Sequence, residues 1–169
     1  IFDINFFGAF DLVHAAWPEL SRTGGRIVVS ASSAGLHGGD GMAAYASSKA
    51  ALIGLVRGLA TEGRPRNVLI NAIAPYAVTA MTEQHLAPGL AARMDPADVA
   101  PLVSWLVSEA CDVTGQTLVS GGGRLRIATA VEGAPVRLDD SIGAAVHAAI
   151  RAEPREAYPD SHTAFAAFM

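Results

Sequence analysis

Hydrophobic positions along the chain follow two spacings in turn, one typical of helices and the other of buried strands. From residue 1 to about residue 20, apolar side chains recur at every third or fourth position, which predicts an amphipathic helix. The glycine pair Gly24-Gly25 predicts where this helix ends. Three short runs are instead apolar at successive positions, as in parallel strands covered on both faces, and they span residues 26–31, 67–73 and 117–119.

Two further helices are predicted between these strands. Residues 43–62 are rich in Ala and Leu, which favours a helix, whereas the small, glycine-rich segment 32–41 before them predicts a loop. Asp95 and Pro96 form an N-cap and a first-turn proline, which predicts a helix running to about residue 110. Strands separated by helical segments imply right-handed crossovers and a parallel sheet, so the sequence predicts an α/β fold.

Signals are weaker in the last part of the chain. Residues 124–132 could form a strand, and Asp139-Asp140 resemble caps of a helix that runs to about Glu153, where Pro154 would end it. Residues 158–169 are expected to form a peripheral helix or a frayed tail.

Composition narrows the class of protein without indicating a reaction. The 169 residues are 51% hydrophobic and 17% charged, which is enough to bury a core and too apolar for general disorder. Neither a repeat nor a long linker divides the chain, so we expect a domain built by residues 1–123, with residues 124–169 packed on it as an extension. The formal net charge is −4 and no basic run occurs, which disfavours nucleic-acid binding.

Two absences bear on where the protein works. No apolar run reaches ~18 residues, the length of a membrane-spanning helix, so no membrane span is expected. The single cysteine, Cys111, fits a reducing compartment, and a cytoplasmic location is expected. The five histidines show no close pairing with carboxylates or cysteine, so no metal site is expected.

Three side chains stand at a spacing that suggests proton transfer. Tyr45 and Lys49 are four residues apart on a predicted helix, so they share one face. A phenol ordinarily titrates near ~10, and a cation held beside it favours the phenolate form. Ser32 follows a predicted parallel strand, at the edge where open α/β sheets place ligands, and its hydroxyl could donate to a substrate oxygen. Such a set of groups could interconvert an alcohol and a carbonyl.

The segments around these residues resemble the short-chain dehydrogenase/reductase family over residues 1–123. Residues 25–35 and 45–51 are similar to the family's catalytic segment, and residues 5–8, Asn-Phe-Phe-Gly, match its Asn-x-x-Gly helix motif. The resemblance implies that four residues are catalytic, namely Asn5, Ser32, Tyr45 and Lys49. In the family the tyrosine passes the proton, the lysine supports it and binds the nicotinamide ribose, the serine holds the substrate oxygen, and the asparagine supports a water in the proton relay.

Residues 71–75 resemble the family's strand leading to the turn that touches nicotinamide. The resemblance therefore implies NAD or NADP as cofactor, bound by Tyr45 and Lys49 and by the turn residues Pro75, Val78 and Thr79. Two positions depart from the pattern: Tyr76 stands where the family usually has Gly, and Ala80 where it commonly has Thr. The segment that follows, which includes Met81, Thr82, His85 and Leu86, is expected to form a mobile substrate lid.

The sequence of this turn is most similar to the (3R)-hydroxyacyl-CoA dehydrogenase unit of peroxisomal multifunctional enzymes and its bacterial relatives. That similarity implies a small-molecule alcohol or ketone substrate, either an acyl thioester or a steroid-like ketone. His37, in the predicted loop after Ser32, could touch it, although a solvated loop residue is the simpler interpretation. The family's association implies a homodimer or a homotetramer.

Two family motifs do not occur in this sequence. Members begin with a strand and a Gly-rich turn, Thr-Gly-x-x-x-Gly-x-Gly, that binds the cofactor pyrophosphate, and they then carry Asn-Asn-Ala-Gly. Residues 38–41 are glycine-rich but follow the catalytic strand, so they are no substitute. The expected fold is therefore a Rossmann-type, doubly wound parallel sheet whose N-terminal nucleotide-binding half is absent.

Other functions stay open at this point. The missing motifs suggest, as an alternative, a truncated and catalytically silent fragment that acts as a structural or dimerisation module. A lyase or epimerase could use the same Tyr-x-x-x-Lys pair, because the proton chemistry is shared. A serine hydrolase is disfavoured, since no Gly-x-Ser-x-Gly motif surrounds any serine.

Overall fold

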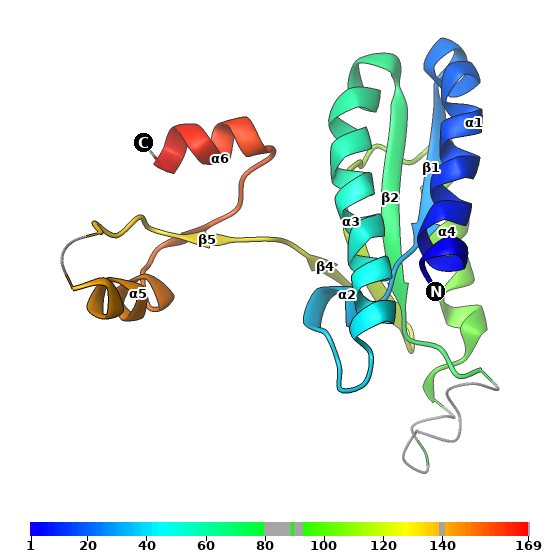
Figure 1. Ribbon diagram of the computed structural model, residues 1–169. Helices are drawn as coiled ribbons and strands as arrows, with labels where there is room; N and C mark the ends of the chain where they lie inside the picture. The colour runs from blue at the N-terminus through cyan, green and yellow to red at the C-terminus, as the bar shows by residue number, and fades with distance from the viewer. Residues whose placement is uncertain (80–88, 90–92, 139–140, 169) are drawn as a thin grey trace. The chain divides into compact units, whose positions relative to one another are not determined.

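The computed structural model describes residues 1–79, 89, 93–138 and 141–168, and the chain divides into two compact units, Ile1–Ala128 and Thr129–Met169 (Figure 1). The elements of the first unit, in chain order, are η1 (Asp3–Phe7, a π-helical turn), α1 (Gly8–Thr23), β1 (Gly25–Ser30), α2 (Ser33–His37), α3 (Ala43–Gly63), η2 (Arg64–Arg66), β2 (Val68–Pro75), η5 (Pro96–Asp98), α4 (Ala100–Leu106), β3 (Thr117–Gly121) and β4 (Arg124–Ala128). Those of the second unit are β5 (Glu132–Gly133), α5 (Ile142–Ile150), β6 (Arg155–Glu156) and α6 (Ser161–Phe168).

The first unit is built around a sheet of order β1-β2-β3-β4. β1, β2 and β3 are parallel, with Ser30 opposite Ile73 and Ala72 opposite Thr117, which confirms the predicted α/β fold with a parallel sheet. β4 pairs antiparallel with β3. Gly122 and Gly123 connect these two strands with φ angles of 56° and 68°, the left-handed values that tight hairpin turns require and glycine adopts freely.

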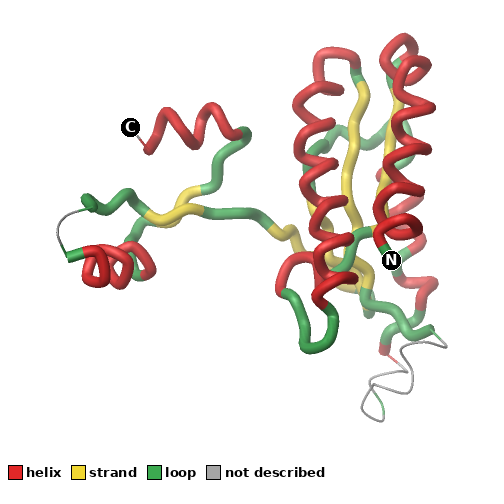
Figure 2. Tube along the Cα trace, viewed as in Figure 1, coloured by secondary structure: helices red, strands yellow, loops and turns green. Residues whose placement is uncertain are grey.

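α1 and α3 cover one face of this sheet, where Figure 2 shows them alongside β1 and β2, and α4 covers the other face. Side chains alternate along each strand, so Val29 and Ile70 face a core formed with α3, while Ile73 faces a second core formed with α4. The first core contains Leu52, Val56 and Ala60 of α3, and the second contains Val99, Leu106, Cys111 and Leu118. This double covering explains the uninterrupted apolar runs in the sequence.

Buried side chains also fix how β2 and β3 are joined. The Nδ2 of Asn71, which is fully buried in β2, donates to the Val113 carbonyl at 2.8 Å. The Oδ1 of Asn71 accepts from the Gln116 main-chain N–H at 3.0 Å. The hydroxyl of Thr114 accepts from the Ile70 N–H at 3.1 Å. The segment leading into β3 is therefore bonded to β2 before the strand pairing begins.

Two sequence expectations about this unit were wrong in detail. The segment 32–41, expected to be a loop, contains the five-residue helix α2, because Ser32 supplies an N-cap for it. The helix that begins after the Asp95 cap ends at Leu106 and not near residue 110. The cap itself is confirmed, since the Asp95 carboxylate accepts from the Ala97 N–H at 2.8 Å.

The second unit contains the two helices expected in the last part of the chain, α5 and α6, of which α5 ends at Ile150, slightly before Glu153. The proposed caps Asp139 and Asp140 lie outside the described residues. The expected strand at 124–132 is confirmed in part, as β4. Packing of the whole segment 124–169 on one domain stays a prediction. No helix in the described part of the chain is both long and apolar enough to cross a membrane.

Candidate active site

The side chain of Lys49 reaches from α3 to the end of the first strand. Its Nζ donates a hydrogen bond of 2.7 Å to the main-chain carbonyl of Ser30, the last residue of β1. The ammonium group also lies 5.8 Å from the centre of the Tyr45 ring, one helical turn earlier. Lys49 is the only lysine in the chain. Its partial burial lowers the pKa of the amine below the ordinary value of 10.5.

The main chain of Tyr45 is fixed within α3, and its hydroxyl is available to bind another molecule. The buried Ser48 donates its hydroxyl hydrogen to the Tyr45 carbonyl oxygen at 2.7 Å, which fixes this turn of α3. The Tyr45 side chain is half-buried. No other residue in the described part of the chain forms a hydrogen bond with its phenol oxygen, so a bound molecule can donate to it or accept from it.

Ser32 lies two residues beyond β1 and caps α2. Its backbone is extended, and its Oγ accepts a hydrogen bond of 3.2 Å from the Ala34 N–H. A hydroxyl that accepts this bond keeps its own proton for donation. The capping role therefore orients the Ser32 side chain without using up its capacity to donate to a substrate oxygen.

Close packing between α2 and α3 brings Ser32 to the same end of the sheet as Lys49. A Cβ atom on Gly35 would lie 2.8 Å from both the Ala50 nitrogen and the Lys49 carbonyl carbon, closer than real side chains approach. Only glycine permits this approach. The elements that carry Ser32, Tyr45 and Lys49 therefore meet at the carboxyl end of β1.

Asn5 lies in η1, which contacts α3 and continues into α1. Its Nδ2 donates to the Ile1 carbonyl at 3.2 Å, and no bond joins it to Ser32, Tyr45 or Lys49 within the described residues. Its neighbour Phe6 packs against the core that α3 helps to form. The structure thus places η1, which carries Asn5, beside α3, which carries Tyr45. No hydrogen bond among the described residues joins Asn5 to the other three side chains.

The residues expected to touch the cofactor follow the end of β2. Pro75 is the last residue of this strand, and the Val78 N–H donates to the Met94 carbonyl at 2.8 Å. Thr79 is exposed. Because β1 and β2 are parallel and in register, this turn and Ser30 lie at the same end of the sheet. Ala80 and the expected lid residues Met81, Thr82, His85 and Leu86 lie outside the described residues.

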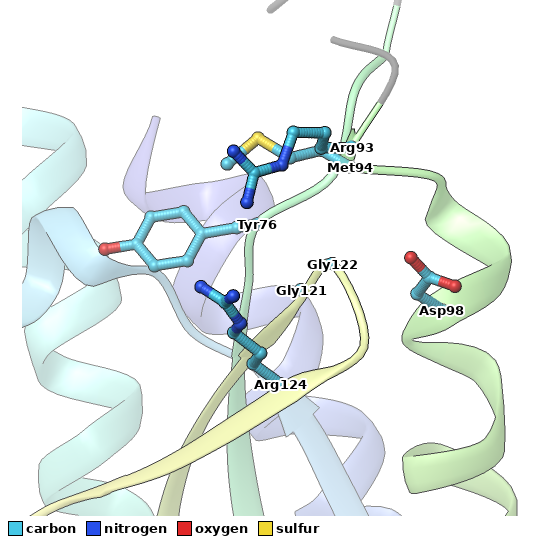
Figure 3. Close-up of a pocket in the computed structure, with 7 residues that line it drawn as sticks. All are labelled: Tyr76, Arg93, Met94, Asp98, Gly121, Gly122 and Arg124. Atoms are coloured by element: carbon cyan, nitrogen blue, oxygen red, sulfur yellow. The ribbon is translucent and has the colours of Figure 1, made fainter. Parts of the chain in front are cut away.

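A cavity of about 560 Å³ opens beyond this turn, lined by Tyr76, Arg93, Met94, Asp98, Gly121, Gly122 and Arg124 (Figure 3). Its lining includes none of the four residues expected to be catalytic. His37 is exposed at the end of α2 and is not among the lining residues. Among the residues that the structure describes, no group of three or more His, Cys, Asp and Glu side chains could hold a metal ion.

Three further groups support this site and were not predicted from the sequence. The main-chain carbonyl of Ser30 holds Lys49, Ser48 holds the Tyr45 turn, and Gly35 allows α2 to approach α3. The spacing of Ser48, three residues after Tyr45, could have suggested its bond to the preceding turn. A main-chain carbonyl carries no signal in the sequence.

Comparison with known proteins identifies the family of this chain. Residues 1–89 match the family model described as short chain dehydrogenase. A short-chain type dehydrogenase/reductase of Mycobacterium tuberculosis is 36% identical over 127 residues, which are 75% of this chain and 44% of that protein. This chain therefore spans less than half the length of that relative.

Several solved structures are similar in fold. The full-length peroxisomal multifunctional enzyme type 2 from Drosophila melanogaster superposes with a TM-score of 0.85 at 25% identity, over 98% of this chain and 32% of that one. A 7 alpha-hydroxysteroid dehydrogenase in complex with NADH and 7-oxo glycochenodeoxycholic acid superposes with a TM-score of 0.63 at 31% identity, over 72% of this chain and 53% of that one.

Proposed function

The chain belongs to the short-chain dehydrogenase/reductase family, and on this premise we propose that it carries the proton-transfer site of an enzyme that interconverts a secondary alcohol and a ketone with NAD or NADP. The observation that carries the proposal is the position of Lys49. Its ammonium group is bonded to the last carbonyl of β1 and lies beside the Tyr45 ring, at the sheet edge where α/β enzymes bind ligands.

In the direction of ketone reduction, three side chains act on the substrate oxygen. The Ser32 hydroxyl donates a hydrogen bond to it and stabilises the negative charge that develops there. The Tyr45 hydroxyl gives it a proton, and the positive charge of Lys49 stabilises the phenolate that remains. Alcohol oxidation runs the same transfers in reverse. Asn5 is proposed to support the water through which Tyr45 regains its proton.

The residues present fit the nicotinamide end of the cofactor. The Lys49 ammonium has three N–H groups and spends one on Ser30, so the others can donate to ribose hydroxyls. Tyr45 offers a second group, and Pro75, Val78 and Thr79 border the same end of the sheet. When bound, the nicotinamide would supply or accept the hydride. The solved hydroxysteroid relative carries NADH, which supports this cofactor class for the present chain.

The proposed substrate is a 3-hydroxyacyl thioester or a steroid-like ketone. Similarity to a peroxisomal multifunctional enzyme supports the first class, and the 7-oxo bile acid in the hydroxysteroid relative supports the second. A cytoplasmic location and a homodimer or homotetramer stay predictions, because the Drosophila relative is a peroxisomal enzyme and the structure contains one chain.

The experiment that tests the proposal compares Tyr45→Phe with Tyr158→Phe in the complete protein. Phenylalanine keeps the ring of Tyr45 and removes its hydroxyl group, which carries the transferable proton, so hydride transfer to a ketone should fall by about 100-fold or more, with NADH affinity unchanged. Tyr158 lies in the second unit, and its substitution is the matched control. Wild-type turnover in Tyr45→Phe would contradict the assignment.

One observation favours the alternative of a silent module. η1 and α1 expose large apolar side chains, with Ile4 82% and Leu12 71% exposed, as do Ile1, Phe2, Phe7 and Phe10 to smaller degrees. Such a surface is suited to association with another protein surface. Fluorescence titration with NADH and NADPH separates the two functions, because binding by the chain supports the enzyme and lack of binding supports the module.

A further inference from the structure

The cavity beyond the β2 turn has walls that are joined to one another by hydrogen bonds and close packing. The Tyr76 N–H donates to the Ser120 carbonyl at 2.7 Å, which joins the turn to β3, and the Val78 N–H bond to Met94 joins it to the Arg93 segment. A Cβ atom on Gly122 would lie 2.6 Å from the Arg93 carbonyl oxygen, so the hairpin turn also packs on that segment. Three stretches of chain far apart in sequence thus form one bonded frame.

Two arginine side chains point into this frame. Figure 3 shows the guanidinium groups of Arg93 and Arg124 directed toward the space beside the Tyr76 ring, whereas Asp98 stands on the other side of the Gly121–Gly122 turn in this view. Neither guanidinium has an ion-pair or hydrogen-bond partner within the described part of the chain. Two cations that face one space repel each other unless an anion lies between them.

The chemistry of the two groups indicates which anion fits. A guanidinium offers planar, paired N–H donors that match phosphate oxygens, and it keeps its charge at all physiological pH values. A phosphate monoester carries about −1.5 to −2 charges at pH 7, so two arginines match its charge. A carboxylate carries a single negative charge, which one arginine would neutralise. Tyr76, at a position where the family usually has Gly, supplies a ring as one wall.

We propose that Arg93 and Arg124 bind a phosphate group carried by the substrate, as in a coenzyme A thioester. This inference rests on the proposed oxidoreductase function and assigns the acyl-thioester class to it. The cavity lies at the same end of the sheet as Ser30, since it borders the residues directly after β2. A substrate could therefore place its carbonyl near Tyr45 and its phosphate between the arginines.

Calorimetric titration of the complete protein with coenzyme A tests the proposal independently of catalysis. Arg93→Gln and Arg124→Gln should each raise the Kd for coenzyme A by roughly tenfold to a hundredfold, because each loses a charged hydrogen-bond donor. Arg126→Gln is the matched control: Arg126 lies two residues further along β4, is exposed, and does not line the cavity. Its Kd should stay within about twofold of wild type, since it makes no direct contact.

A parallel titration with NADPH distinguishes the substrate from the cofactor as the source of the phosphate. Unchanged NADPH affinity in the two cavity variants supports the proposal. The proposal is overturned if the wild type does not bind coenzyme A, if the cavity variants bind it as the wild type does, or if they lose affinity for NADPH instead. If coenzyme A binding depends on both arginines but no ketone is reduced, the anion site stands and the proposed oxidoreductase function fails.

Discussion

The ammonium group of Lys49 and the main-chain carbonyl of Ser30 form a hydrogen bond of 2.7 Å that ties α3 to the end of β1. This bond spans 19 residues of sequence and sets the position of the only lysine in the chain. It orients the ammonium beside the Tyr45 ring, where positive charge can stabilise a phenolate. The same contact therefore serves the local structure and the proposed chemistry.

Replacement of Lys49 by Met should separate these two roles. Turnover should fall by about 100-fold or more, because no cation then stabilises the phenolate form of Tyr45. The free energy of unfolding should change by less than about 1 kcal/mol, since Ser30 is exposed and its carbonyl can bond to water instead. Kinetic assays and urea denaturation measure the two effects. A large loss of stability with normal turnover would show that Lys49 is structural only.

The pKa of Lys49 should lie below 10.5, because its partial burial disfavours the charged form. Lys49 is the one lysine within residues 1–169, so after reductive methylation with ¹³C-formaldehyde an NMR titration can follow its resonance, which is assigned by its loss in Lys49→Met. The same resonance in denaturant gives the reference value. A folded-state pKa equal to or above that reference would contradict the expected effect of burial.

This pKa difference also predicts how stability depends on pH. Between the lowered pKa and 10.5 the unfolded chain binds more protons at Lys49 than the folded chain does. The contribution of Lys49 to the free energy of unfolding therefore increases as pH rises through this window, and is least favourable below it. The difference in stability between wild type and Lys49→Met should follow that course in urea denaturation at a series of alkaline pH values. A difference that is independent of pH would contradict it.

Much of the first unit could be predicted from the sequence because its strands are buried on both faces. The runs that became β1, β2 and β3 are apolar at successive positions, and the Asp95 cap was recognisable from one dipeptide. α2 could not be predicted, since a five-residue helix shows no full period and depends on the Ser32 cap and on packing of Gly35 against α3. The direction of β4 depends on its pairing with β3, which no local signal reveals.

The candidate site likewise has a part that could be predicted from the sequence and a part that could not. Tyr45 and Lys49 share a face because they are one helical turn apart, and helical periodicity makes that visible in the sequence. The Ser30 carbonyl and the bonded frame around Arg93 and Arg124 arise from contacts between distant segments. Such contacts depend on the register of the sheet and on turn geometry, so they appear only in the folded structure.

Gly35→Ala should destabilise the fold and displace Ser32. The added Cβ would meet main-chain atoms of Lys49 and Ala50 at 2.8 Å, and main chain in the middle of a helix cannot move aside cheaply. We expect a loss of about 1–3 kcal/mol in the free energy of unfolding, together with a fall in turnover. Gly58→Ala is the control, because Gly58 lies in α3 with nothing within 4 Å of its Cβ position, and alanine there should be neutral or stabilising. Unchanged stability and turnover in Gly35→Ala would show that α2 and α3 are not closely packed.

Asn71→Ala should be among the most destabilising single substitutions in the first unit. Its amide group bonds the Val113 carbonyl and the Gln116 N–H from a fully buried position, so alanine leaves both main-chain groups without that partner. Because each buried, unpaired group costs about 1–3 kcal/mol, we expect a loss of about 2–5 kcal/mol in urea denaturation. Asn67→Gly is the control, because Asn67 is exposed and has a φ angle of 55°, which glycine adopts readily. The free energy of unfolding of this variant should fall by less than about 1 kcal/mol. If the two variants lose similar amounts of stability, the Asn71 side chain does not join β2 to the segment before β3.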